Sequence, residues 1–308
     1  MSKDTSQRAI EWPTVALLVG FFAAWSAIVV GHGSIPWPLQ VIALVYLGGL
    51  WMSLGHELLH GHPTRWNWVN TAVGFLPLAF WVPFARYKAL HIKHHLSDLT
   101  DPEDDPESFY VPPPVWQHAG RWRRRYYLFL RTVPGRLTLG VPRGIVRFWR
   151  REVRMAAGGG IVLPWTLHLL ACVAFGWWLF GIVQMNPLVY IFGFCLGGSA
   201  CTQLRSFVEH AAVAEGTRCA VVRAGAPMAL LFLNNNLHHT HHALPDLEWY
   251  RIPAMHRRIG ADALAEAGAG LYRGGYLEVV RTYFLQPFCQ PDHPLSPGAR
   301  PYGSRGLT

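Results

Sequence analysis

Four stretches of the chain are long and apolar enough to cross a lipid bilayer. A helix needs about 20 residues to span roughly 30 Å of hydrocarbon, and inside lipid its backbone polar groups must be hydrogen-bonded internally. The stretches cover residues 13–30, 38–55, 161–182 and 187–204. With 51% hydrophobic and only 15% charged residues, the composition does not suit an ordinary soluble enzyme. The sequence therefore predicts an all-α integral membrane protein with four transmembrane helices in two hairpins.

Basic residues are distributed unevenly around these stretches. The turns inside the two hairpins, residues 31–37 and 183–187, contain no Lys or Arg, whereas the long segment 56–157 is rich in Arg and also contains Lys88 and Lys93. Short cytoplasmic loops carry the excess of Lys and Arg in membrane proteins. We therefore expect a multi-pass protein of a bacterial-type inner membrane, with both termini and the long basic segment in the cytoplasm.

Two further segments are expected to lie at the membrane surface. Residues 66–84 are apolar but interrupted by Pro77 and Pro83, which favours an interfacial or re-entrant piece over a fifth span. Residues 142–157 alternate Arg with apolar side chains at helical spacing, which favours an amphipathic helix on the inner leaflet; a basic loop is the alternative. Residues 1–290 are expected to form one domain, and residues 291–308 a poorly ordered tail.

Most of the histidines gather in short clusters near the ends of the predicted spans. The clusters are HELLHGH from His56, HIKHH from His91, SFVEH ending at His210 and LHHTHH from Leu237. Histidines at positions i, i+3 and i+4 share one face of a helix, so a cluster can aim several imidazoles at one place. The candidate metal ligands are His56, His60, His91, His94, His95, His210, His238, His241 and His242.

The number of clustered histidines indicates more than one metal ion. Neutral imidazole is a good ligand for iron, zinc and copper. Nine nitrogens are too many for one ion, whereas two ions with four or five nitrogens each would use the whole set. An isolated histidine in an apolar chain is usually structural. We expect this of the lone histidines, which are His32, His118, His168, His256 and His293.

Two other classes of metalloprotein fit part of this pattern. HELLH matches the HExxH helix of zinc proteases, in which Glu57 would be the general base. Such a protease needs only one further ligand, which leaves most of the clustered histidines without a purpose. A histidine-rich metal transporter is the other class, but its ligands would be expected at mid-membrane rather than at the ends of spans.

The clusters resemble those of the membrane fatty acid desaturase superfamily, which includes desaturases, hydroxylases, alkane monooxygenases and carotenoid ketolases. The resemblance runs from His56 to Pro253 and is carried by HELLH, HIKHH, the EH at Glu209 and His210, and NNNLHHTHH from Asn234. It implies a di-iron centre held by a cytoplasmic helical cap on four spans. The extra His62 after the first cluster, and the lack of an HPGG-like cytochrome b5 motif in this sequence, leave the substrate open.

Residues beside the clusters are candidates for orienting the ligand imidazoles. On a helix, Asn235 would share the face of His238 and His242, although the Asn run could equally form a turn or a helix cap. The acidic segment TDPEDDPES resembles one that is common in this superfamily after the second cluster. Its Asp101 and Asp105 could accept hydrogen bonds from ligand N–H groups, with a solvated loop as the alternative.

His62 and His239 are additional histidines inside the clusters. On a helix, His239 is rotated by about 100° from His238, away from the shared face. His62 precedes Pro63, which biases its backbone away from helical angles. We therefore expect neither residue to bind metal directly, and both are further candidates for supporting the ligands from outside.

The resemblance implies an oxidase that uses two iron ions and O2 to oxidise unactivated C–H bonds. Desaturation of a fatty-acid or other acyl chain is the expected reaction, and the alternative is a hydroxylase or ketolase of an alkane, lipid, carotenoid or small molecule. No catalytic residue beyond the metal ligands is expected. Electrons would come from an external ferredoxin, rubredoxin or cytochrome on the cytoplasmic face, where the net charge of +9 favours an acidic partner. The expected partners are thus this carrier, a hydrophobic substrate and membrane lipid, and no nucleic acid.

Overall fold

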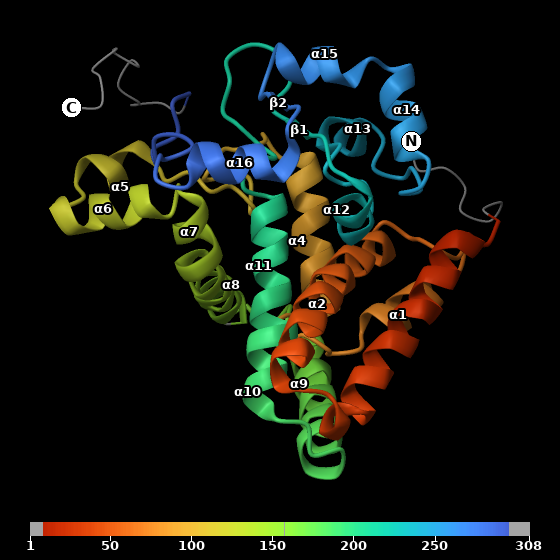
Figure 1. Cartoon of the computed structure of the whole chain (residues 1–308). Coiled ribbons are helices and arrows are strands. Elements are labelled where there is room, and N and C mark those ends of the chain that lie inside the picture. The colour runs from red at the N-terminus through yellow and green to blue at the C-terminus, as the bar shows by residue number, and fades with distance from the viewer. Residues whose placement is uncertain (1–8, 157, 296–308) are drawn as a thin grey trace.

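The computed structural model describes residues 9–156 and 158–295, and this part of the chain is mostly helical (Figure 1). Four helical spans in it are long and apolar enough to cross a membrane. They are α1 (Trp12–Val30), α2 (Trp37–Leu59), α9 (Val162–Gly176) continued by the π-helical η4 (Trp177–Ile182), and α10 (Pro187–Tyr190) continued by the π-helical η5 (Ile191–Gly197) and α11 (Gly198–Arg205). The prediction of four spans is confirmed. The second span runs past its expected end at residue 55, so its last turns carry the first histidine cluster.

The spans form two helical hairpins whose turns lie at the same end of the molecule, at the bottom of Figure 1. The short helix η2 (His32–Ser34) joins α1 to α2, and residues 183–186 join η4 to α10. The Nε2 atom of His32 lies 3.0 Å from the carbonyl oxygen of Val183, so this lone histidine links the two turns. The histidine clusters lie at the other end of the spans.

The second and fourth spans pack closely against one another. A methyl group in place of the Gly48 Hα would lie 2.2 Å from the carbonyl oxygen of Phe194, and Gly198 in turn faces the backbone of Gly48. Small residues allow membrane helices to approach this closely. The contact sets the separation between the end of α2, which carries His56, and the end of α11, which leads into His210.

The apolar run after the first histidine cluster turns back without crossing. It consists of α3 (Asn67–Gly74), an irregular segment, and the start of α4 (Phe84–Leu96). The carbonyl oxygen of Leu78 accepts a hydrogen bond from the Tyr190 hydroxyl at 3.1 Å, and that of Phe80 lies 2.9 Å from the Nε2 atom of His168. Irregular backbone at membrane depth needs such partners. These contacts agree with the re-entrant interpretation of the run, and the lone His168 takes part in them.

The remaining elements cover the histidine end of the spans. They are α5 (Pro113–Gln117), α6 (Arg121–Phe129), α7 (Val133–Gly135), the π-helical η3 (Arg136–Gly140), α8 (Val141–Ala156), β1 (Val221–Val222), α12 (Ala226–Leu231), α13 (His238–Ala243), α14 (Ile252–Arg258), α15 (Ala261–Glu266), β2 (Leu271–Tyr272) and α16 (Gly275–Tyr283). β1 and β2 pair in parallel. The expected helix at 142–157 corresponds to α8, which exposes Val146, Trp149 and Val153 among its arginines. Residue 157 lies outside the described residues.

The first residues of the expected tail pack against the rest of the protein. The carbonyl oxygen of Pro291 accepts a hydrogen bond from the backbone N–H of Val111, and the backbone N–H of His293 donates to the carbonyl oxygen of Val111. His293 is 3% exposed. The chain is thus anchored as far as residue 293, and the rest of the predicted tail, residues 296–308, lies outside the described residues.

Candidate metal centre

The nine candidate ligands come from four separate places in the chain and converge. His56 lies in the last turns of α2, and His60 directly follows that helix. Helix α4 carries the second cluster and α13 the fourth. His210 lies beyond α11, where it forms an isolated β-bridge with Cys219, and its Nδ1 atom lies 3.3 Å from the carbonyl oxygen of Arg218.

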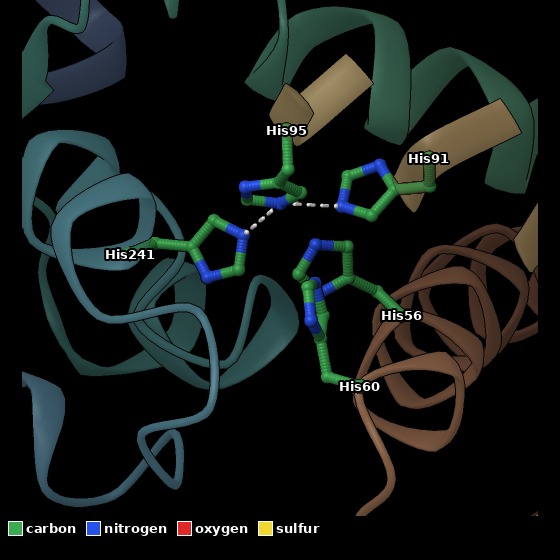
Figure 2. Close-up of side chains that lie close together, drawn as sticks. All are labelled: His56, His60, His91, His95 and His241. Atoms are coloured by element: carbon green, nitrogen blue, oxygen red, sulfur yellow. Dashed lines mark hydrogen bonds between the residues drawn. The ribbon is translucent and has the colours of Figure 1, made fainter. Parts of the chain in front are cut away.

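The histidines form two groups. The first consists of His56, His60, His91, His95 and His241, and the second of His94, His210, His238 and His242. Within each group, ligand nitrogens of all members lie within 4.8 Å of one another. Figure 2 shows the five rings of the first group pointing toward a common centre from α2, α4 and α13. The structure therefore brings together all nine residues that the sequence singled out, and no other His, Cys, Asp or Glu of the described chain joins them.

Distances between the nitrogens fit metal coordination. The Nε2 atom of His95 lies 3.0 Å from that of His91 and 3.1 Å from that of His241. The Nε2 atom of His210 lies 3.2 Å from that of His94 and 2.9 Å from that of His238. Two imidazole nitrogens that bind one ion at right angles, each at about 2.1 Å, are about 3 Å apart.

Two ligand nitrogens have no hydrogen-bond partner among the described residues. They are the buried Nε2 atoms of His60, in the first group, and of His242, in the second. A buried polar atom without a partner is costly, and most such atoms in proteins are paired. A cation in each group would give both atoms their missing partner.

Carboxylate and amide groups contact the Nδ1 atoms of several of these imidazole rings. The Nδ1 atom of His91 lies 2.8 Å from Glu107 Oε1, and that of His94 lies 2.7 Å from Asp105 Oδ1. A carboxylate in this position fixes the tautomer, so that Nδ1 carries the proton and Nε2 is free to bind a metal. The expectation for Asp105 matches this placement, and Glu107 belongs to the same acidic segment.

The Asn run before the last cluster is anchored at all three positions. Asn235 lies between the two groups, with its Oδ1 3.0 Å from His238 Nδ1 and its Nδ2 3.3 Å from His56 Nε2. Asn234 and Asn236 donate to the backbone carbonyls of Trp249 and Val222. The structure thus places Asn235 against two candidate ligands, while its neighbours fix the turn that leads into α13.

Burial favours the neutral form of most of the imidazoles. Burial and the neighbouring imidazoles together lower the pKa of both His95 and His210 to about 3. His94 differs, because burial lowers its pKa but the carboxylates of Glu107 and Asp105 outweigh that effect and raise the pKa to about 8. A neutral imidazole has the free lone pair that a metal requires.

Two of the candidates for supporting residues lie away from the ligands. Asp101 accepts a hydrogen bond from the backbone N–H of Glu103 at 2.8 Å, so its carboxylate caps a turn of its own loop. The Nδ1 atom of His239 lies 2.9 Å from the hydroxyl of Thr217. Neither hydrogen bond involves a candidate ligand. These contacts give both side chains a local structural role, and the support of the ligands expected from Asp101 and His239 stays a prediction.

His62 lies where the segment after α2 meets the start of α1. Its Nδ1 atom lies 2.5 Å from Glu11 Oε1, and both side chains are buried. Glu11 precedes the first turn of α1, so the pair ties the start of that helix to the segment after α2. That His62 also supports a ligand stays a prediction beside this link between α1 and α2.

The other lone histidines also bond outside the two groups. The Nδ1 atom of His118 lies 2.8 Å from the carbonyl oxygen of Pro114, and the hydroxyl of Thr100 lies 3.0 Å from His293 Nε2. His256 contacts the hydroxyl of Thr240 at 2.8 Å and so braces α13 between its ligands. These positions agree with the structural role expected for isolated histidines.

An ion pair that the sequence analysis did not single out lies beside the second group. The Nε atom of Arg205 lies 2.9 Å from Glu209 Oε1, and that oxygen lies 3.4 Å from the Nδ1 atom of His238. Both side chains are buried. An acidic residue directly before a candidate ligand, at helical spacing from an arginine, is the signal that could have revealed the pair.

A cavity of about 990 Å³ reaches both histidine groups. His91 of the first group and His210 of the second line it, together with Tyr87, Glu107 and Glu209. Its size lies within the usual range for sites that bind small molecules. A substrate in this cavity would lie beside both groups at once.

Comparison with known proteins agrees with this arrangement. The family model "Fatty acid desaturase" matches residues 33–274. The chain is 26% identical over 260 residues to a beta-carotene ketolase of Paracoccus sp., covering 76% of this chain and 88% of that protein. A second Paracoccus beta-carotene ketolase is 26% identical over 238 residues, or 71% of this chain and 81% of the relative.

Shorter matches are found to plant enzymes. A bifunctional fatty acid conjugase/Delta(12)-oleate desaturase of Punica granatum is 33% identical over 90 residues, which cover 29% of this chain and 20% of that protein. The family model covers most of the chain, and the relatives are desaturases, conjugases and ketolases. With its four spans and clustered histidines, this chain is a membrane oxidoreductase that belongs to the fatty acid desaturase family.

Proposed function

We propose that two iron ions occupy the two histidine groups and that the protein is an O2-dependent oxidase of unactivated C–H bonds. The observation that carries the proposal is the division of the nine histidines into one group of five and one of four. Imidazole sites suit several transition metals, and membership of the fatty acid desaturase family favours iron. When bound, the irons would supply the activation of O2 for C–H oxidation.

The residues of the chain hold the ligands and keep water away. Glu107, Asp105 and Asn235 fix rings through Nδ1, which leaves Nε2 directed at the centre of a group. His56 and His241 are 1% and 2% exposed and His91 is also buried, whereas His60 and His95 are partly exposed, so most of the first group is shielded from solvent. A dry site protects a reactive oxidant from side reactions.

We propose an acyl chain as the substrate and desaturation as the reaction. The matches to a fatty acid conjugase/desaturase and the cavity beside both histidine groups support this. The second candidate is a ketolase acting on a carotenoid or another hydrophobic molecule. The beta-carotene ketolase of Paracoccus favours it, because that match covers 88% of the relative.

We further propose that an external acidic carrier, a ferredoxin, rubredoxin or cytochrome, delivers the electrons. Arg121, Arg124 and Arg125 are exposed on α6, and the net charge of the chain is +9. Opposite charges favour docking between the carrier and this face. The concentration of Arg and Lys between residues 56 and 157 supports a cytoplasmic position for the histidine end, in a bacterial-type inner membrane.

Product analysis tests this function. Lipid and small-molecule extracts from cells that express the wild-type chain should contain a species that has lost two hydrogens, or gained an oxygen, relative to cells that express His91→Ala. His118→Ala serves as the matched control, because His118 is bonded only to the carbonyl oxygen of Pro114 and should leave the product unchanged. Identical extracts from wild type and His91→Ala, at equal protein levels, would refute the proposal.

A further inference from the structure

Several arginines line the cavity beside the histidines. The segment from η3 to α8 contributes Arg136, Arg143, Arg147 and Arg151 to its lining, and Arg131 lies next to them. The lining also contains two acidic side chains, and both have other partners. Glu107 contacts His91, and Glu209 pairs with Arg205. Among the described residues, neither carboxylate forms a salt bridge with the arginines of the segment from η3 to α8.

Arg136 is the residue that most clearly lacks a counter-charge. Its side chain is 6% exposed, and its Nε atom is buried with no hydrogen-bond partner in the described structure. The guanidinium lies over the ring of Phe109, at 3.2 Å from the centroid. Burial lowers the pKa of Arg136, and the charges of Arg131 and Arg143 lower it further. The aromatic ring holds the guanidinium but does not neutralise it.

The neighbouring Arg131 and Arg147 have no anionic partner in the described chain either. Arg131 donates to the carbonyl oxygens of Phe109 and Pro291, and Arg147 donates to that of Ser108. All of these acceptors are neutral. Within residues 9–156 and 158–295, the salt bridges include none between a carboxylate and Arg131, Arg136 or Arg147.

A buried charge is tolerated in proteins when something compensates it. The guanidinium is a rigid fork of donors that matches carboxylate and phosphate groups. We propose that the cavity binds an amphiphile whose anionic group, a carboxylate or a phosphate, contacts Arg136. This inference rests on the proposed function, because it takes the cavity to be the site of the substrate. A neutral hydrocarbon would leave Arg136 without a partner.

The rest of the lining suits the apolar part of such a molecule. Met52, Trp81, Leu90 and Phe148 line the cavity as well. These side chains offer no strong hydrogen-bonding group except the Trp81 indole, and they lie along a cavity that also reaches the histidines. An acyl chain with its anionic end on Arg136 would therefore place carbon atoms, rather than the polar end, beside the histidine groups.

Binding to the full-length protein tests the inference. Purified protein in neutral maltoside micelles would be titrated with radiolabelled dodecanoate, dodecyl phosphate and 1-dodecanol at matched mole fractions, and bound probe measured by scintillation proximity. Dodecanoate or dodecyl phosphate should bind at least tenfold more tightly than dodecanol. Arg136→Gln should weaken binding of the anionic probe by about ten- to a hundredfold, the range expected for a lost hydrogen bond to a charged group, and leave dodecanol unchanged.

Two variants and one competition complete the design. Arg136→Lys keeps the charge and should bind the anionic probe more tightly than Arg136→Gln, and Arg257→Gln removes an exposed arginine outside the cavity and should behave as wild type. Removing an unpaired buried charge should not lower the thermal midpoint of Arg136→Gln. Displacement of dodecanoate by phosphatidylglycerol would identify a membrane lipid headgroup as the anion, and no displacement would identify a free amphiphile.

Equal binding of dodecanol and the anionic probes to wild type would overturn the inference, as would unchanged binding of the anionic probe to Arg136→Gln. Because the readout is binding rather than turnover, a protein found to contain no iron would still give a clear result here. Failure of the proposed function and failure of this inference are therefore distinguishable.

Discussion

Two of the histidine motifs supply both groups, in opposite proportions. HIKHH gives His91 and His95 to the first group and His94 to the second, whereas LHHTHH gives His238 and His242 to the second group and His241 to the first. Consecutive residues on a helix point about 100° apart, so a helix that lies between two sites can supply both. In each motif the last two histidines are adjacent, and they belong to different groups: His94 and His95 in HIKHH, and His241 and His242 in LHHTHH.

The two groups differ in the number of their ligands and in the carboxylates beside them. Two carboxylates contact the first group: Glu107, whose side chain is 38% exposed, and the buried Glu57, whose Oε1 atom lies 3.6 Å from the Nδ1 atom of His56. The second group has one histidine fewer, and it is flanked by Asp105 and Glu209, whose side chains are 1% and 6% exposed. Two bound irons would therefore not be equivalent, because the second group offers four nitrogens instead of five and both carboxylates beside it are buried, whereas Glu107 beside the first is partly exposed.

The largest effects are expected from removing one ligand of each group. His60→Gln and His242→Gln are a matched pair, because each deletes a buried Nε2 atom that has no other partner. Each variant should lower the iron content from about two to about one per chain and abolish turnover, since loss of a direct ligand disables a site. Iron analysis of the purified variants checks this. If both irons were lost from either variant, the groups would not be separable sites.

The next largest effects are expected from the carboxylates that contact one ligand of each group. Asp105→Asn and Glu107→Gln each weaken the acceptor for the N–H of one ligand, and such changes typically cost about 10- to 100-fold in metal affinity or activity. We expect the larger loss for Asp105→Asn, because the Asp105–His94 pair is buried while Glu107 is partly exposed. Turnover and iron retention during dialysis against a chelator measure both. A larger loss for Glu107→Gln would reverse the ranking of the two groups.

Replacing Asn235 is expected to affect metal binding in both groups. Its amide lies between His56 of the first group and His238 of the second. Asn235→Ala should lower activity about tenfold, the lower end for an outer partner, and increase the rate of iron loss from both groups. Chelator-release kinetics would then show two accelerated phases, where Asp105→Asn shows one. One accelerated phase for Asn235→Ala would mean that Asn235 serves a single group.

The smallest effects on iron are expected from the histidines outside the groups. His62→Gln should keep both irons but unfold more easily, because it disrupts the buried contact with Glu11, at a cost of about 1–3 kcal/mol. His239→Gln, which changes a contact with Thr217, should alter neither iron content nor turnover. Thermal unfolding and iron analysis of the same preparations separate the two. Iron loss from either variant would add that histidine to a group.

The fold follows from the sequence where hydropathy determines it. The first predicted span, 13–30, corresponds to Trp12–Val30, and the fourth, 187–204, to Pro187–Arg205. The second predicted span, 38–55, is continued by helix as far as Leu59. Hydropathy marks only the apolar part of a helix, so it does not locate the polar turn at the end of this span.

The nine histidines and two centres with four or five nitrogens each were predicted from the sequence, but not which histidine belongs to which group. Spacing places His94 and His95 on one helix, whereas their assignment to different groups depends on which helices lie on each side of α4. The acidic segment shows the same limit, because Asp105 reaches His94 while Asp101 caps its own turn. Arg136 is the clearest case of this limit. Only the folded structure shows that its buried Nε atom has no hydrogen-bond partner among the described residues.

The occupancy of the two groups is most directly tested by anomalous X-ray diffraction at the iron absorption edge, from crystals of the protein purified with its native metals. The account predicts two anomalous peaks, one among His56, His60, His91, His95 and His241 and the other among His94, His210, His238 and His242. A single peak shared by both groups, or peaks that appear at the zinc edge instead, would contradict it.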